Sequence, residues 1–161
     1  MKSILRQNQS RRFGRLSRGN RGAVQIEFIL SIMVIMFVIF GMWELIMIVH
    51  TMNVLSDAAK EGVRYAIVHG SYNTSGFQSG PAPGNTLAVE SYVKDYANLT
   101  FHDMSAISVS VTYPDGVSVA DPTGNKAGDK VRVEVAYTFV PYTALNLKPT
   151  LRAASEGRIV F

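Results

Sequence analysis

AVQIEFILSIMVIMFVIFGMWELIMIVHTMNVLSDAAKEGVRYAIV, residues 23–68, is the stretch that decides the fold. Its first part, residues 23–49, carries only two charged side chains, Glu27 and Glu44. As a helix this part would be roughly 40 Å long, which is enough to cross a bilayer. The run is longer than the core of a signal peptide, and no small-x-small cleavage site directly follows it. The sequence therefore predicts a transmembrane helix over 23–49 that stays in the protein.

The segment after the predicted span keeps the spacing of a helix. Apolar residues recur there at steps of three and four positions, which is typical of one helical face: Met52, Leu55, Ala59, Val63 and Ala66. No proline interrupts 50–68, and Gly70 is suited to end the helix. We expect one continuous helix to about Val68, whose second half, 50–68, is an amphipathic stalk with its apolar stripe facing a sheet.

Residues 1–22 form a basic leader. They contain seven Lys or Arg residues and no acid, whereas the rest of the chain has nine basic and twelve acidic side chains. A basic arm is also typical of nucleic-acid binding. Here it lies directly before an apolar span, and such a flank is retained on the cytoplasmic side of a membrane. We therefore expect a lipid bilayer and not nucleic acid as the partner, with the N-terminus cytoplasmic and the C-terminal domain outside.

Residues 69–161 are predicted to form a small α+β domain. The segment 71–86 is dense in Gly, Ser, Pro and Asn and predicts a loop. A short helix is expected over 87–99, with Asn85 or Thr86 as its N-cap. A sheet of three to four antiparallel strands beside the amphipathic helix would make one pair of layers.

The strands are predicted from alternation of apolar and polar residues. This pattern begins at Ser105 and continues to 112, and it is clearest over 130–140. Val117 and Val119 are suited to a further short strand. A closing strand is expected over 151–161, with Gly157 as a weak point or a bulge.

The N-terminal half of the chain resembles a known family. The leader ends in Gly22, and Glu27 would be the fifth residue of a chain that began at Ala23. This arrangement is similar to the processing site of type IV pilin-like proteins. The pair Glu27-Phe28 is similar to the Glu-Tyr pair of the Tad/Flp branch of pilins.

The stalk carries the second part of the resemblance. The pair Ala58-Ala59, the run Gly62-Val63-Arg64-Tyr65-Ala66 and the internal Glu44 resemble the signature of TadE-like proteins. The resemblance implies a minor pilin or pseudopilin of a tight-adherence pilus, inserted in the bacterial inner membrane and cleaved after Gly22 by a prepilin peptidase. It implies other pilin subunits and pilus-assembly membrane proteins as partners. An uncleaved single-span anchor with an extracytoplasmic binding domain stays open as the alternative.

Two interpretations stay open for each carboxylate of the span. Cleavage would create an α-amine at Ala23, one helical turn before Glu27. A carboxylate paired with that amine, or with a neighbour's, costs far less in an apolar surrounding than an isolated one. Alternatively, Glu27 lies near the cytoplasmic interface and reaches water. Glu44, next to Trp43, either contacts water at the outer interface or makes a polar contact with a partner helix.

In the stalk, structural roles are favoured over recognition. A glycine within a helix costs roughly 1 kcal/mol relative to alanine, so a strand packed closely over Gly62 is the expected reason for this residue. Arg64 is expected to pair with Asp57, Glu61 or an acid of the sheet.

The sequence offers no catalytic residues, and we expect no enzyme and no cofactor. There is no cysteine, so disulfides, thiolate metal sites and cysteine nucleophiles are excluded. The three histidines lack the spacing of a metal motif, and no nucleophile elbow or phosphate loop occurs. The acids of the loop 121–129 lack the spacing of a calcium-binding EF-hand, so a turn is expected there and no metal site.

Overall fold

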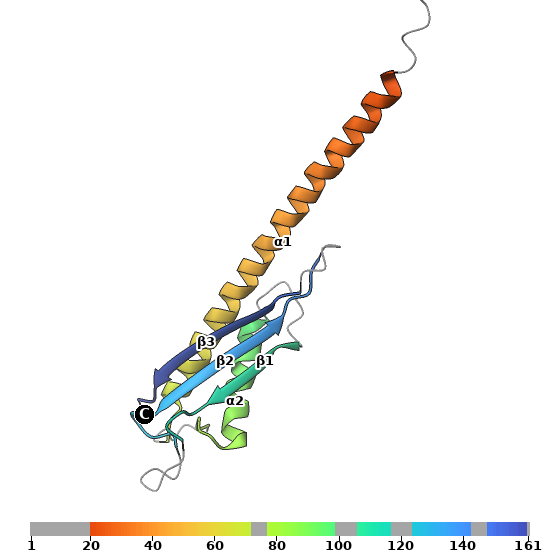
Figure 1. The fold of residues 1–161 in the computed structure, drawn as a ribbon. Helices are drawn as coiled ribbons and strands as arrows, with labels where there is room; N and C mark the ends of the chain where they lie inside the picture. Colours follow the sequence, from red (N-terminus) through yellow and green to blue (C-terminus); the bar gives the residue numbers. More distant parts are fainter. Residues whose placement is uncertain (1–19, 72–76, 99–105, 117–123, 143–147, 161) are drawn as a thin grey trace, which may run out of the picture. The chain divides into compact units, whose positions relative to one another are not determined.

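The computed structural model describes residues 20–71, 77–98, 106–116, 124–142 and 148–160. Two helices precede three strands (Figure 1): α1 (Asn20–Val68), α2 (Pro83–Ala97), β1 (Ser108–Thr112), β2 (Lys130–Thr138) and β3 (Thr150–Arg158). The chain divides into two compact units, Met1–Met42 and Trp43–Phe161, and the continuous helix α1 contributes to both. The predicted α+β class is confirmed.

The described part of the first unit is the apolar portion of α1. All side chains from 22 to 40 are exposed, and most of them are large and apolar. The helix is long and apolar enough to cross a bilayer, which is compatible with a single-pass membrane anchor. An exposed apolar surface of this extent needs lipid or a protein partner to cover it.

The second unit is built on a three-stranded antiparallel sheet in the order β1-β2-β3. The predicted alternation in the central strand is confirmed, because Val131, Val133, Val135 and Tyr137 are all buried. In the edge strand β1, Val109 and Val111 are only half-buried. The other edge strand, β3, buries Leu151 and Ala153, so the alternation is buried more deeply in β2 and β3 than in β1.

Both helices cover one face of the sheet, and they contact each other (Figure 1). Tyr65 of α1 stacks on Tyr92 of α2, with ring centroids 4.8 Å apart. Gly62 of α1 lies beside Val93 of α2 and Val133 of β2. The core of the unit therefore lies where the second half of α1, α2 and the inward face of the sheet meet.

Two hydrogen bonds join the ends of the sheet to α1, one near Glu44 and the other near Ile67. At one level, the backbone N–H of Tyr142, just after β2, donates to Oε1 of Glu44. At the other, the backbone N–H of Val160, just after β3, donates to the carbonyl of Ile67. A helix from Glu44 to Ile67 rises roughly 35 Å, and an extended strand from Pro149 to Val160 covers roughly 36 Å. The sheet therefore matches the second half of α1 in length.

The structure corrects two predicted details. The second helix begins at Pro83 with Ala82 as its N-cap, so the prediction of Asn85 or Thr86 as the cap was wrong. Proline is favoured at the first helical position, where its ring presets the backbone angle and its missing N–H costs nothing. Gly157 is no bulge, because β3 pairs residue for residue with β2 and places Gly157 opposite Val131. The short strand predicted at Val117 and Val119 lies outside the described residues.

Candidate functional site

The predicted processing residues lie in the first turns of α1. The helix begins at Asn20, so Gly22 and Ala23 are helical, and no neighbouring atom lies within 4 Å of a Cβ position at Gly22. Glu27 and Phe28 are exposed on the helix. The hydroxyl of Ser31 donates to the backbone carbonyl of Glu27 at 2.9 Å. Cleavage after Gly22 stays a prediction.

Glu44 is buried within the second unit. Its side chain is 0% exposed, and Oε1 accepts a hydrogen bond from the backbone N–H of Tyr142 at 3.2 Å. The contact joins the helix to the segment after β2, within one chain. Glu44 therefore does not contact open water, and its polar contact with a partner helix stays a prediction. A buried carboxylate needs such a hydrogen bond, because loss of hydration is otherwise uncompensated.

The small residues of the stalk motif face the sheet and α2. Ala58, Ala59 and Ala66 are at most 1% exposed, and Gly62 is also buried. A Cβ atom at Gly62 would overlap Cγ2 of Val93 and lie 3.3 Å from Cγ1 of Val133. The expected packing of a strand over Gly62 is therefore present, and α2 approaches even more closely. Because these residues are small, the side chains of Val93 and Val133 pack directly against the backbone of α1 at Gly62.

The larger residues of the motif lie at the edge of this packing. Arg64 is exposed and forms an ion pair with Glu61, one of its three predicted partners, with 3.7 Å between Nη1 and Oε1. Exposed pairs of this kind contribute little to stability. Tyr65 lies between two rings, stacking on His69 at 4.0 Å between centroids as well as on Tyr92. The tyrosine of the motif thus links α1 to α2.

A buried polar cluster closes the C-terminal end of α1. The hydroxyl of Ser79 donates to the carbonyl of Ala66 at 2.6 Å, and the amide of Asn125 donates to the carbonyl of Ser79. The backbone N–H of Ser71 donates to the carbonyl of Asn125 at 3.1 Å. The sequence pattern did not predict this cluster, since Ser79 and Asn125 stand in segments expected only to be loops. The one available signal was a Ser and an Asn beside Gly80 and Gly124.

Tyr113 follows β1 close to this cluster. Burial raises the pKa of the Tyr113 hydroxyl above its ordinary value, since a buried phenolate would lose its hydration. The nearby side chain of Ser79 and backbone of Gly80 lower this pKa, and their influence is weaker than that of burial.

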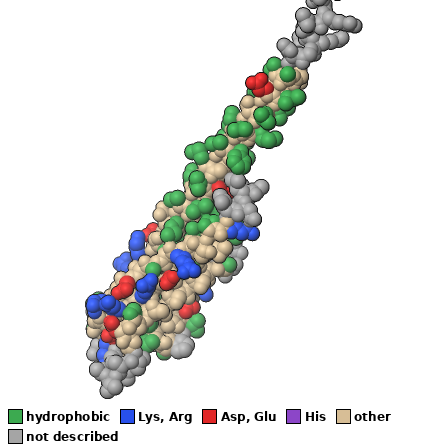
Figure 2. Space-filling view, viewed as in Figure 1, with side chains coloured by type: hydrophobic (Ala, Val, Ile, Leu, Met, Phe, Trp, Pro, Cys, Tyr) green, Lys and Arg blue, Asp and Glu red, His purple; other side chains and the backbone are tan. Residues whose placement is uncertain are grey.

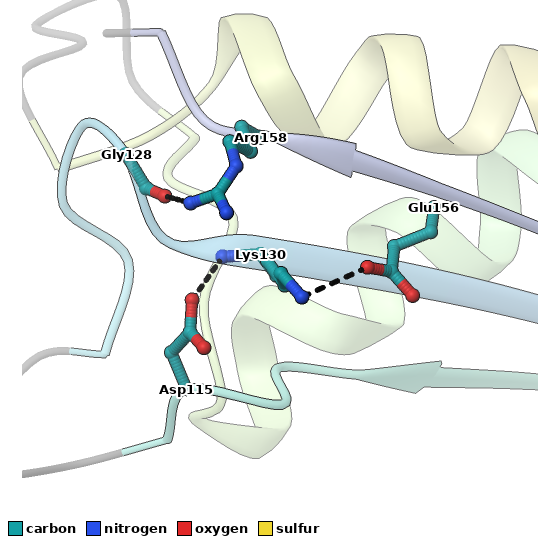
Figure 3. Close-up of polar contacts among 5 residues, drawn as sticks. All are labelled: Asp115, Gly128, Lys130, Glu156 and Arg158. Carbon is teal, nitrogen blue, oxygen red and sulfur yellow. Dashed lines mark hydrogen bonds and ion pairs between the residues drawn. The ribbon is translucent and has the colours of Figure 1, made fainter.

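Charged residues gather at the end of the sheet where β2 begins and β3 ends (Figure 3). The backbone N–H of Lys130 donates to Oδ2 of Asp115 at 2.8 Å, and its Nζ lies 3.5 Å from Oε1 of Glu156. Nη1 of Arg158 donates to the carbonyl of Gly128 at 2.7 Å. Figure 2 shows further charged side chains over the sheet and apolar ones along the helix. This end of the unit is therefore strongly polar.

Within the described ranges, no group of three or more His, Cys, Asp or Glu side chains is placed to hold a metal ion. Asp121, which belonged to the loop weighed as a calcium site, lies outside those ranges.

Comparison with known proteins bears on the N-terminal part of the chain. The family model described as TadE-like protein matches residues 22–64. This range runs from Gly22 through the apolar helix to Arg64 of the stalk. Comparisons with curated proteins and with solved structures give no match. The match covers the same residues that suggested the resemblance and confirms that residues 22–64 are similar to TadE-like proteins.

Proposed function

We propose that this chain is a membrane-anchored minor pilin or assembly component of a Tad-type pilus. The observation that carries the proposal is that the TadE-like match over 22–64 coincides with the exposed apolar part of α1 and the stalk that packs on the sheet. The family resemblance implies association with pilus components. The proposed role is non-catalytic, with α1 as the anchor and the α+β unit as the part presented to partners.

The proposed orientation places residues 1–22 in the cytoplasm and the α+β unit outside. It is supported by the seven basic residues that precede the apolar run, since Lys and Arg flanks are retained on the cytoplasmic side. A prepilin peptidase is proposed to cut between Gly22 and Ala23. The new α-amine would then lie one turn from Glu27, and pairing between them would offset the cost of a carboxylate in an apolar assembly.

N-terminal sequencing of the protein purified from membranes tests the processing step. The expected first residues are Ala-Val-Gln-Ile-Glu. A chain that begins at Met1, or anywhere outside residues 22–24, would overturn processing and favour an uncleaved anchor with an extracytoplasmic binding domain.

The variant Glu27→Gln tests the role of the charge. We expect expression and cleavage to persist and pilus assembly, scored by electron microscopy of cells, to be lost. The variant Glu61→Gln is the matched control, because Glu61 lies on the same helix and forms a surface ion pair with Arg64. Normal pili in Glu27→Gln would mean that Glu27 merely contacts interfacial water.

A further inference from the structure

Glu44 fixes the level along α1 at which the end of the sheet is attached. Its Oε1 accepts the backbone N–H of Tyr142 at 3.2 Å. The backbone N–H of Phe139 donates to the carbonyl of Pro149 at 3.0 Å, so the pairing of β2 with β3 extends beyond the last strand residues toward the same end. The residues after Phe139 thus lie at the helical turn that contains Glu44.

This end of the unit exposes large apolar and aromatic side chains. Trp43 is 55% exposed, Val140 is 58% exposed and Tyr142 is 51% exposed. Trp and Tyr are enriched where membrane meets water, because the ring is apolar and the N–H or O–H group remains hydrated. The opposite end of the sheet instead carries Asp115, Lys130, Glu156 and Arg158 (Figure 3). One end of the unit therefore carries several charged side chains, whereas the other end exposes Trp43, Val140 and Tyr142 together with one lysine, Lys148.

The outward face of α1 stays apolar beyond the level of Glu44. Leu45, Ile46 and Val49 are each about 60% exposed. Polar residues appear on the exposed face only from Asn53, followed by Asp57 and Lys60. Leu45, Ile46 and Val49 lie close to Glu44 on the helix, where Tyr142 is bonded. A lipid layer that covers these three side chains would therefore also extend to Tyr142.

The length of the helix places this level at a membrane boundary. Counted from Val24, a hydrocarbon core of about 30 Å takes up roughly 20 helical residues and ends near Trp43. The interfacial layer beyond the core would then contain Glu44 and the turn after it. At this level Glu44 is 0% exposed, and its Oε1 accepts the backbone N–H of Tyr142.

We propose that the end of the sheet formed by Val140–Tyr142 inserts into the outer interface of the bilayer, beside Trp43, and that the hydrogen bond to Glu44 holds it there. The proposal rests on the membrane anchoring proposed above. The occupant of this apolar end is the lipid interface. The α+β unit would then lie with one end in the headgroup region and would not stand clear of the membrane on a free stalk.

Fluorescence quenching in vesicles tests the depth of Tyr142. Trp43 is the single tryptophan of the chain and therefore reports its own position without substitution. The double variant Trp43→Phe/Tyr142→Trp moves the reporter to position 142. The full chain is reconstituted in phosphatidylcholine and phosphatidylglycerol vesicles that carry bromine near the headgroup end of the acyl chains. We expect the reporter at position 142 to be quenched by these lipids as strongly as Trp43 and to be shielded from aqueous iodide.

The matched control is Trp43→Phe/Leu87→Trp. Leu87 is 61% exposed on α2, near the end of the unit closed by Ser79 and Asn125. Its reporter should be quenched by iodide and not by brominated lipid. The proposal is overturned if the reporter at position 142 behaves like that at position 87 while native Trp43 is quenched by lipid. If native Trp43 is also not quenched by lipid, the membrane anchoring itself fails.

Substitution of Glu44 tests what holds the segment in place. In the background with the reporter at position 142, Glu44→Ala removes the acceptor, and we expect weaker quenching by lipid and stronger quenching by iodide. Glu44→Gln keeps a side-chain oxygen acceptor and should restore the original profile. Far-UV circular dichroism checks that both variants keep their helices. Unchanged quenching in a folded Glu44→Ala variant would remove the positioning role of Glu44.

Discussion

Gly157 of β3 lies directly against Val63 of α1: a Cβ atom added to Gly157 would come within 2.7 Å of Val63 Cγ1. It would also come within 2.6 Å of Ile67 Cδ1. The backbone of the strand can approach the helix this closely only because residue 157 has no side chain. The contact holds the second half of α1 on the sheet near the end where Val160 bonds to Ile67.

The first prediction is that Gly157→Ala destabilises the second unit by about 1–3 kcal/mol, the usual cost of overpacking a tight core. Unfolding of the full chain in detergent micelles, followed by near-UV circular dichroism of the tyrosines, measures the change. Gly84→Ala is the control, because no neighbouring atom lies within 4 Å of its Cβ position on α2. It should be neutral or gain up to about 1 kcal/mol from helix propensity. Equal stability of the two variants would contradict the close approach.

The second prediction concerns Gly62 and Val93. Gly62→Ala should destabilise the unit, because its Cβ would overlap Cγ2 of Val93. Val93→Ala should also destabilise it, by about 1–3 kcal/mol, because it removes buried apolar volume. In the double variant the new methyl group occupies part of the space that Val93 leaves. Its loss of stability should therefore be smaller than the sum of the two single losses by at least about 0.5 kcal/mol. Simple additivity would show that the two residues do not compete for the same space.

The third prediction tests the cluster that closes the end of α1. Asn125→Ala removes the amide that donates to the carbonyl of Ser79 and leaves that buried carbonyl without the bond. The expected cost is about 1–3 kcal/mol. Hydrogen exchange should speed up most at the amides of Ser71 and Ser79, which bond to Asn125 and His69. Asn53→Ala, at an exposed position of α1, should leave these exchange rates unchanged.

The fourth prediction is that ionisation of Tyr113 makes the stability of the folded chain depend on pH. Its folded-state pKa lies above the ordinary value of 10.0 because of burial. The neutral hydroxyl is thus favoured in the folded state, and its contribution to stability is complete below pH 10. The contribution is lost as the pH rises from 10 through the folded-state pKa, since the unfolded state loses the proton first.

The variant Tyr113→Phe has no proton to lose. We compare the free energy of unfolding of the native chain with that of Tyr113→Phe. The difference between the two should be constant at pH 7–9. Above pH 10 the native chain should lose stability relative to the variant, by up to about 1.4 kcal/mol per pH unit. Denaturant titrations of both chains across this range measure the difference. A constant difference up to pH 11.5 would exclude the raised pKa.

Periodicity predicted the elements whose burial repeats along the chain. The steps of three and four residues through 50–68 indicated the buried face of α1, and the alternation over 130–140 indicated the buried face of β2. The start of α2 was less predictable. Asn and Thr favour N-caps, but Pro83 presets the helical backbone angle two residues earlier and begins the helix there without a side-chain cap.

The candidate site was predictable where it depends on local spacing. The basic leader, Gly22, Ala23 and Glu27 stand within one or two turns of each other, and the match to the TadE-like family covers the apolar helix and the stalk motif. The small residues of the motif also indicated close packing. The pattern did not tell which element would pack there, and at Gly62 both β2 and α2 do.

The sequence by itself determined the long apolar helix with its amphipathic continuation, the central strand and the similarity of residues 22–64 to TadE-like proteins. These depend on the repeat of apolar side chains along a segment, and a repeat is visible without knowing the partner. Only the tertiary structure decided that Glu44 bonds to Tyr142, that Asn125 bonds to Ser79 and that Gly157 lies under Val63. The physical reason is that burial of a face follows from composition and spacing, whereas the identity of a contact across tens of residues depends on the register in which the sheet and the helices pack.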